Sequence, residues 1–461
     1  MEILSKDTEK IGFERVKEAM AERIFRLGQG SGEGARSRNI VRLEIACPDI
    51  DCVGWLSRQI SENKIYWSGR GKEFEMAGVG TADLLKEDGH VDYEGLFLNL
   101  RLGLSRENKY LRYYGGISFS NKEQDADWKQ FGSYCFVIPR FEIFKAEGKT
   151  FFAFNIAGND INSPQINECL AQLTGLNFSG EQFHDDIPPA CSTRNYPDRF
   201  NWEKIFNEDI QSAGKMAFEK IVLARKTTIV FERDINPLSL FSQIKDKSNG
   251  CFYYYFQPSA SAVFLGATPE RLFKRVEALV ESEAVAGTKP RGESRDEDVF
   301  YQRELLSSGK ESLEHRYVAD LIRKVLSGYC LSLREEKAGS ILKISAAQHL
   351  ITRFQGMLKK GVSDARLLSS LHPTPAVGGC PRGGALKAIS RIEPFARGWY
   401  AGPIGFVGYD ELDFAVAIRC ALVQGEKVSL FAGAGIVEGS TAENEWREIE
   451  NKSSVYTRLF K

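Results

Sequence analysis

The sequence predicts an α+β fold, because segments with strand periodicity and helical segments fall in separate runs instead of alternating as repeated units. Its 461 residues are 43% hydrophobic, which is enough to bury a large core. In the last quarter of the chain, three strand-like segments follow one another at residues 402–407, 413–423 and 427–436. Only short turns separate them, and they therefore indicate an antiparallel meander.

The first half contains one helix and several strand-like segments. Apolar periodicity predicts a helix over residues 7–27 and strands over residues 39–46, 64–67, 136–139 and 150–156. Regular structure is then interrupted between residues 169 and 198, at Gly175, Gly180, Pro188, Pro189 and Pro197. We interpret this stretch as the connection between an N-terminal half, residues 1–198, and a C-terminal half, residues 199–461, of a single unit.

The second half carries clearer patterns. A helix over residues 201–218 leads into strands over residues 220–225 and 227–231. Further strands are expected over residues 253–256 and 262–266, and further helices over residues 311–326 and over all or part of 340–354. The meander at residues 402–436 follows.

Charge and composition exclude several kinds of partner. The net charge is −1, which gives no electrostatic reason to expect a nucleic acid or an anionic membrane. No apolar window approaches the length of a membrane span, and the N-terminal segment does not resemble a signal peptide. The nine scattered cysteines suit reduced thiols. We therefore expect a soluble cytoplasmic protein with no nucleic-acid or membrane partner, and its oligomeric state stays open.

Residues 433–452 combine a glycine-spaced turn with a charged helix. Ser440 and Glu443 fit a capping box, which predicts that the helix begins near Thr441. On that helix Glu445, Glu448 and Lys452 are spaced by three and four residues, so they share one face. Two acids and a base suit a divalent metal together with an anion, although a solvated helix face beside a tight turn gives the same pattern.

Four further charged residues occur in apolar surroundings. Glu314 falls within an apolar helical stripe, where a carboxylate needs a cation, a metal or a proton. Arg419 alternates with alanines, which leave room for an anion held by the guanidinium. Lys220 shares a strand face with apolar residues, which favours a neutral amine that can act as a base. Glu270 follows an apolar strand at a turn. Each residue alone is more often part of a structural salt bridge.

Ordered motifs across the chain resemble the chorismate-utilising enzymes, and within them the isochorismate synthases of menaquinone and siderophore pathways. In the second half the matching motifs are Lys220-Ile221-Val222-Leu223-Ala224-Arg225, Gly266-Ala267-Thr268-Pro269-Glu270-Arg271-Leu272, Ala286-Gly287-Thr288, Ser312-Leu313-Glu314-His315, His372-Pro373-Thr374-Pro375-Ala376-Val377-Gly378-Gly379, Gly398-Trp399-Tyr400-Ala401-Gly402, Ile418-Arg419-Cys420-Ala421 and residues 433–452. In the first half they are Tyr66-Trp67-Ser68-Gly69-Arg70, Tyr114-Gly115-Gly116-Ile117-Ser118-Phe119 and Phe131-Gly132-Ser133-Tyr134.

The resemblance implies two extended antiparallel sheets packed face to face, with helices outside and the site in a cleft of the C-terminal half. It implies an isomerase acting on chorismate, with Lys220 as the base that activates water for attack at C2. Glu270 would be the acid that protonates the departing C4 hydroxyl. Glu314 and Glu448 would bind Mg²⁺, with Glu445 helping directly or through water.

The same resemblance assigns the groups that hold the substrate. Arg419 and Tyr400 are similar to residues that bind the enolpyruvyl carboxylate. The remaining positions expected at the substrate are Gly287, Thr288, Ala376, Gly433 and Lys452.

The resemblance also bears on the choice of reaction within the family. A lysine at position 220 favours water over ammonia as the nucleophile, and Ala376 stands where salicylate-forming members usually have threonine. The expected product is therefore isochorismate for menaquinone synthesis, with a salicylate synthase, a siderophore-pathway enzyme or a non-catalytic chorismate-binding subunit as alternatives. Gly383-Gly384 stands where the family usually carries acidic residues, a departure that concerns the local loop geometry.

Overall fold

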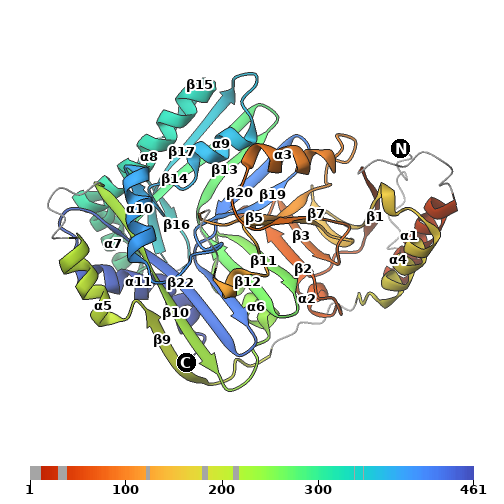
Figure 1. Ribbon diagram of the computed structural model, residues 1–461, viewed down its shortest axis with the longest axis horizontal. Helices are drawn as coiled ribbons and strands as arrows, with labels where there is room; N and C mark the ends of the chain where they lie inside the picture. Colours follow the sequence, from red (N-terminus) through yellow and green to blue (C-terminus); the bar gives the residue numbers. More distant parts are fainter. Residues whose placement is uncertain are drawn as a thin grey trace.

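The structure is a computed structural model that describes residues 12–29, 39–120, 125–178, 185–210, 218–336, 338–345 and 347–460. Within these ranges, two large antiparallel sheets pack against each other and helices cover their outer surfaces (Figure 1). The α+β class and the two-sheet architecture are therefore confirmed.

Sheet A contains twelve strands among the described residues. In spatial order they are β1 (Ile40–Cys47), β8 (Lys149–Ala157), β7 (Phe141–Ala146), β3 (Phe74–Val79), β2 (Lys64–Ser68), β11 (Phe252–Ser259), β12 (Ala262–Thr268), β21 (Cys420–Gln424), β22 (Lys427–Ile436), β10 (Lys220–Phe231) and β18 (Gly379–Cys380), with β9 (Ala190–Tyr196) also paired to β10.

Sheet B contains ten strands within the same ranges. Their order is β15 (Cys330–Glu335), β17 (Ala347–Leu358), β14 (Leu279–Pro290), β13 (Arg271–Val276), β20 (Glu411–Val416), β19 (Pro403–Val407), β5 (Tyr113–Ile117), β6 (Tyr134–Ile138) and β4 (Asp83–Glu87), with β16 (Ser340–Lys343) paired to β17. Each sheet combines strands from both sides of residue 198.

The helices lie outside the two sheets, and their apolar faces pack against the strands. They are α1 (Phe13–Gln29), α2 (Cys52–Ser57), α3 (Tyr93–Leu102), α4 (Ser163–Gly175), α5 (Arg199–Lys204), α6 (Pro237–Lys247), α7 (Arg295–Ser307), α8 (Gly309–Tyr329), α9 (Asp364–Leu371), α10 (Arg382–Ile392) and α11 (Ala442–Thr457). Two of them position the candidate site: α8 packs on β14 and β17, and α11 packs on β22. Among the described residues, no helix is both long enough and apolar enough to cross a membrane.

The main core lies between the sheets. Strand β2 illustrates how alternation builds it, because Ile65 and Trp67 face this core whereas Tyr66 faces a second core under the helices. The ring of Trp67 in sheet A lies 6.3 Å from that of Phe406 in sheet B. Tyr66 instead meets Phe241 of α6 at 5.1 Å. Successive apolar residues of this strand thus pack alternately into the core between the sheets and into the core under the helices.

A two-stranded ribbon passes from one sheet into the other. Strands β12 and β21 pair in sheet A, and their continuations β13 and β20 pair in sheet B. Pairing persists through the bend, where Ala267 N–H donates to the Arg419 carbonyl at 3.1 Å and Val416 N–H donates to the Glu270 carbonyl at 3.0 Å. Both Glu270 and Arg419 therefore lie where the ribbon changes sheets.

The strand predicted over residues 413–423 is wrong in one respect. It consists of β20 and β21, which belong to different sheets, so the expected meander is two hairpins joined by a bend. Arg419 has φ of 52°, in the left-handed region, and it therefore does not alternate along one strand face.

Other predicted elements need correction or are only partly described. The helix considered for residues 340–354 is wrong, because β16 and β17 occupy them; β-branched and aromatic residues such as Ile351, Thr352 and Phe354 suit a strand. The connection at 169–198 contains the end of α4 and all of β9. The helix predicted over residues 201–218 corresponds to α5 followed by a π-helical turn, Ile205–Ile210. Its residues 211–217 lie outside the described ranges, as do residues 7–11 of the first predicted helix.

Candidate active site

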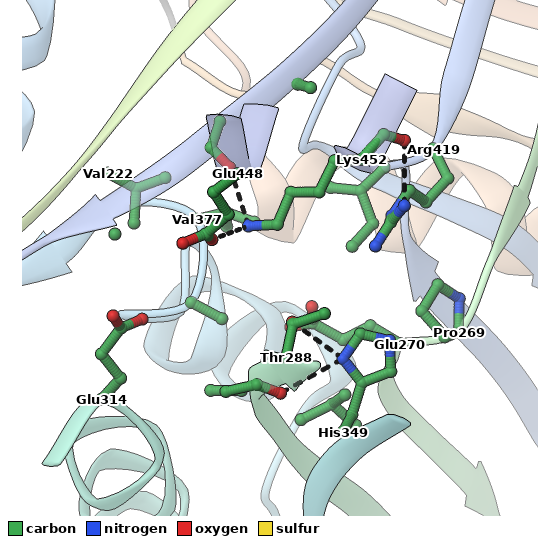
Figure 2. A pocket seen from close by; sticks show the side chains of 18 of the residues that line it. Val222, Pro269, Glu270, Thr288, Glu314, His349, Val377, Arg419, Glu448 and Lys452 are labelled. Atoms are coloured by element: carbon green, nitrogen blue, oxygen red, sulfur yellow. Dashed lines mark hydrogen bonds and ion pairs between the residues drawn. The ribbon is translucent and has the colours of Figure 1, made fainter. Parts of the chain in front are cut away.

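A cavity with an empty volume of about 750 Å³, part of it open to solvent, collects nearly all of the residues singled out in the sequence (Figure 2). Sheet A, sheet B, α8, α11 and the ribbon bend all contribute to its lining. Eleven predicted site residues line it: Lys220, Glu270, Gly287, Thr288, Glu314, Ala376, Tyr400, Arg419, Gly433, Glu448 and Lys452. Glu445 is not part of the lining.

Lys220 is the first residue of β10 and is 1% exposed. Its Nζ lies 3.4 Å from Glu314 Oε2, a carboxylate in the first turns of α8. Gly435 of β22 makes room for this pair, because a Cβ there would lie 2.6 Å from Glu314 Oε2 and 3.1 Å from Lys220 Cε. The predicted burial of Glu314 on its helix is confirmed, since it is 7% exposed.

Glu270 is buried at the ribbon bend and is 3% exposed. Burial raises the pKa of its carboxyl group to about 8, against the opposing effect of Lys220 and Lys452, and the negative charge of Glu283 adds to the increase. The group is therefore mainly protonated at neutral pH. A carboxylic acid that keeps its proton at pH 7 can act as a general acid.

Two carboxylates of α11 are paired with lysines. Lys452 Nζ lies 2.6 Å from Glu448 Oε1, and Lys310 Nζ lies 2.6 Å from Glu445 Oε1. Burial by itself would raise the pKa of Glu448, but Lys452 holds it below its ordinary value. Burial and the charge of Glu448 raise the pKa of Glu445. Of the two, Glu448 thus keeps its negative charge more readily.

The donor set fits a divalent ion of the magnesium type. Glu314 and Glu448 enter the cavity from different helices (Figure 2), and buried Glu445 Oε2 has no hydrogen-bond partner among the described residues. Mg²⁺ is commonly held by one or two carboxylates together with substrate oxygens and water. Across the ranges described, no three acidic, histidine or cysteine side chains already form a metal cluster.

Cations and a phenol also line the cavity. Arg419 donates through Nη1 to the Lys452 carbonyl at 2.9 Å, and Lys452 Nζ donates to the Gly433 carbonyl at 2.9 Å (Figure 2). The Tyr400 ring stacks on Phe431 with centroids 5.4 Å apart. These contacts fix a guanidinium and an ammonium beside a hydroxyl, an arrangement suited to binding a carboxylate.

The wall opposite α11 is formed by a bulge in β14. Gly287 has φ of 75°, and the strand register shifts between Ala286 and Thr288. Thr288 N–H donates to Glu311 Oε2 at 2.9 Å, and the Thr288 hydroxyl lies 3.0 Å from His349 Nδ1. Burial lowers the pKa of His349 to about 3, so this imidazole is neutral and serves as a polar contact.

Sequence reasoning did not place Lys310, Glu311 or His349 at the site. Glu311 precedes Glu314 by three residues, the same spacing that links Glu445 to Glu448, and this repeat was an available signal. Lys310 pairs with Glu445 across two helices. No local pattern shows that contact, because it depends on how α8 and α11 pack.

The glycine-spaced segment differs from the expected turn. Gly433 and Gly435 lie inside strand β22, and the turn falls later, at Gly439, where φ is 84°. Helix α11 begins at Ala442, so the predicted start is confirmed, but its N-cap is Thr441, whose side chain accepts from Asn444 N–H. Ser440 instead accepts from Val437 N–H.

Comparisons with known proteins agree with this geometry. A family model described as chorismate binding enzyme matches residues 26–459. The chain is 33% identical over 470 residues to the chloroplastic isochorismate synthase of Catharanthus roseus, covering 92% of this chain and 81% of that protein. It is 30% identical over 434 residues to isochorismate synthase MenF of Haemophilus influenzae, covering 92% of each. The solved structure of MenF, the menaquinone-specific isochorismate synthase from Escherichia coli, superposes with a TM-score of 0.84 at 26% identity, covering 96% of this chain and 99% of that one.

Proposed function

Because the chain belongs to the family of chorismate binding enzymes, we propose that it is an isochorismate synthase, an isomerase that converts chorismate to isochorismate. One observation carries the proposal: the amine of Lys220 and the protonated carboxyl of Glu270 line the same cavity. A base and an acid in one site are what an exchange of hydroxyl groups on a ring requires.

The reaction needs two proton transfers. Lys220 takes a proton from water while the water oxygen forms a bond to C2 of the ring. The ring double bonds shift, the C4–O bond breaks, and Glu270 gives its proton to the departing hydroxyl, which leaves as water. One water enters and one leaves, so the product is an isomer of the substrate.

Chorismate is a dianion, and the cavity offers a place for each carboxylate. Arg419, Lys452 and Tyr400 would bind the enolpyruvyl carboxylate. Thr288 and the backbone at Gly287 would border the ring, together with Ala376. Ala376 stands where salicylate-forming members of the family usually have threonine, which favours isochorismate as the product.

Magnesium would be held by Glu314 and Glu448, with Glu445 joining directly or through water. When bound, the ion would supply positive charge for the ring carboxylate. Glu314→Gln should raise the magnesium concentration needed for half-maximal activity by about tenfold or more. Activity that survives exhaustive chelation would contradict a metal requirement.

We also assign the product to menaquinone synthesis. This assignment is supported by the extent of the match to two MenF proteins, which includes both halves of the chain. Loss of the gene in a bacterium that respires with menaquinone should abolish menaquinone unless isochorismate is supplied by another enzyme.

The decisive experiment is a product analysis. Purified protein is incubated with chorismate and magnesium, and isochorismate, salicylate and anthranilate are separated by chromatography. Isochorismate as the main product is expected. Salicylate as the main product would favour a salicylate synthase, and unchanged chorismate would favour a non-catalytic binding subunit.

A further inference from the structure

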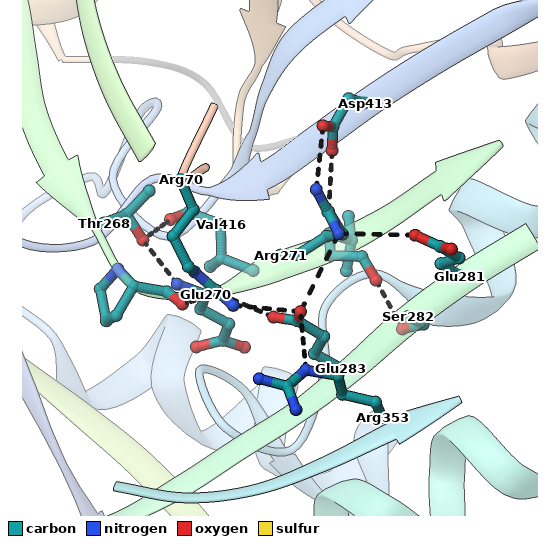
Figure 3. A network of polar contacts seen from close by, with 12 residues as sticks. Arg70, Thr268, Glu270, Arg271, Glu281, Ser282, Glu283, Arg353, Asp413 and Val416 are labelled. Carbon is teal, nitrogen blue, oxygen red and sulfur yellow. Dashed lines mark hydrogen bonds and ion pairs between the residues drawn. The ribbon is translucent and has the colours of Figure 1, made fainter. Parts of the chain in front are cut away.

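Arg70, from the N-terminal half, reaches the back of the Glu270 bend (Figure 3). It lies in the turn between β2 and β3, and its Nη2 donates to the carbonyl of Pro269, the residue immediately before Glu270. The same guanidinium grips Glu283 of β14 with both terminal nitrogens, at 3.1 and 2.7 Å. The guanidinium carbon of Arg70, Cζ, also lies 5.0 Å from the centroid of the Phe252 ring.

The opposite side of the bend is held by a separate set of bonds. The Thr268 hydroxyl donates to the Val416 carbonyl at 2.7 Å and accepts from Glu270 N–H at 3.3 Å. Val416 N–H in turn donates to the Glu270 carbonyl. Arg70 therefore completes a clamp in which the peptide groups before and after Glu270 are fixed from two directions.

The charge of Glu283 alone does not account for Arg70. Arg271 and Arg353 also approach Glu283, with N–O distances of 3.9 and 3.8 Å. The carboxylate would thus keep cationic neighbours if Arg70 were absent. Two features distinguish Arg70 from these two arginines: it hydrogen-bonds Glu283 with both terminal nitrogens, and it joins that carboxylate to the Pro269 carbonyl.

We propose that Arg70 is a positioning residue for Glu270, and that the N-terminal half thereby takes part in catalysis without touching the substrate. By fixing the Pro269 carbonyl and Glu283 together, Arg70 sets the direction in which the Glu270 carboxyl enters the cavity. The inference rests on the proposed function, in which Glu270 delivers a proton to the leaving group. A misplacement of about 1 Å at such a group can cost about 100-fold in rate.

The test compares Arg70→Gln, Arg70→Lys and Arg353→Gln. Arg353 is the matched control, because it approaches the same carboxylate from an exposed position and has no bond to Pro269. We expect Arg70→Gln to lower kcat by about 10- to 100-fold while KM for chorismate stays within about threefold. Lysine keeps the charge but cannot grip both partners, so Arg70→Lys should recover only part of kcat. Arg353→Gln should keep kcat within about twofold.

Two results would overturn the inference: an Arg70→Gln enzyme that keeps its kcat, or one that changes only KM. If Arg70→Gln does not fold, as judged by circular dichroism, the folded Arg70→Lys enzyme decides by the same criterion. Failure of the proposed function is seen separately, in the product of the unsubstituted enzyme. Should that product be salicylate or anthranilate, the kcat ratio of variant to unsubstituted enzyme for that product still tests the role of Arg70.

Discussion

Lys220 and Glu270 occupy the cavity as a pair whose tasks demand opposite protonation states. The proposed base needs a free lone pair to accept a proton from water, whereas the proposed acid needs a proton to donate to the leaving hydroxyl. A proposed base and a proposed acid that line one cavity are typical of acid–base catalysis. At the scale of single residues, the two predictions below separate the two roles.

Removing the base should stop the reaction without removing the site. Lys220→Ala is expected to lower kcat by about 10²- to 10⁴-fold, the usual contribution of a general base, while chorismate still binds. Turnover is measured by product chromatography and binding by calorimetry. Lys226→Ala is the control, since Lys226 lies on the same strand but pairs with Asp127 away from the cavity. Unchanged turnover in Lys220→Ala would refute the assigned role.

The acid should make the rate depend on pH. Because burial raises the pKa of Glu270 to about 8, the protonated form dominates below that pH and is lost above it. We therefore expect kcat/KM, which reports the groups of the free enzyme, to fall about tenfold per unit as pH rises beyond about 8. Glu270→Gln has no such proton to lose, so it should be slower by about 10²- to 10⁴-fold and should lack this decline. A decline near pH 8 that persists in Glu270→Gln would assign it to another group.

At the scale of elements, the site depends on how closely β22 approaches α8. The strand presents Gly435 to Lys220 and Glu314, and there is no space for a side chain between them. This close approach is what lets the buried side chains of Lys220 and Glu314 meet at 3.4 Å. The glycine therefore has a steric role within a regular strand, where glycine is otherwise unfavourable.

A methyl group at this position should displace the pair. Gly435→Ala is expected to lower kcat by about 10- to 100-fold and to destabilise the fold by about 1–3 kcal/mol through overpacking. Gly383→Ala is the control, because its Cβ would meet nothing within 4 Å on helix α10. That variant should keep its activity and gain about 0.5–1 kcal/mol of stability. Kinetics and thermal unfolding measure both effects, and full activity in Gly435→Ala would contradict the steric argument.

Local patterns predicted elements better than they predicted how elements meet. The buried position of Glu314 follows from helical periodicity, which is a property of a few neighbouring residues. Arg419 was misplaced because the alternation of residues 413–423 is the same whether one strand or two sheets are involved. Lys310 and Glu311 were missed because their partners lie on other elements, Glu445 on α11 and Thr288 on β14. The family motifs supplied the grouping that periodicity could not.

At the scale of the whole molecule, the two halves of the chain share both sheets. Strand β2 of the first half pairs with β11 of the second in sheet A, and β5 pairs with β19 in sheet B. The halves also meet at single residues: Trp399 Nε1 donates to the Gly132 carbonyl at 3.0 Å. The predicted boundary at residue 198 thus lies between segments that complete the same layers.

This sharing predicts that the C-terminal half cannot fold alone, although it contains every residue of the proposed acid–base and metal chemistry. A fragment of residues 199–461 would expose β11 and β19 as unpaired edges and would leave the inter-sheet core without the side chains of β2 and β5. Unpaired edges of apolar strands favour aggregation. We expect the fragment to be insoluble or to lack dispersed amide signals, whereas the full chain unfolds in one calorimetric transition. A soluble fragment with a cooperative transition would show instead that the first half is an addition to an independently folding unit.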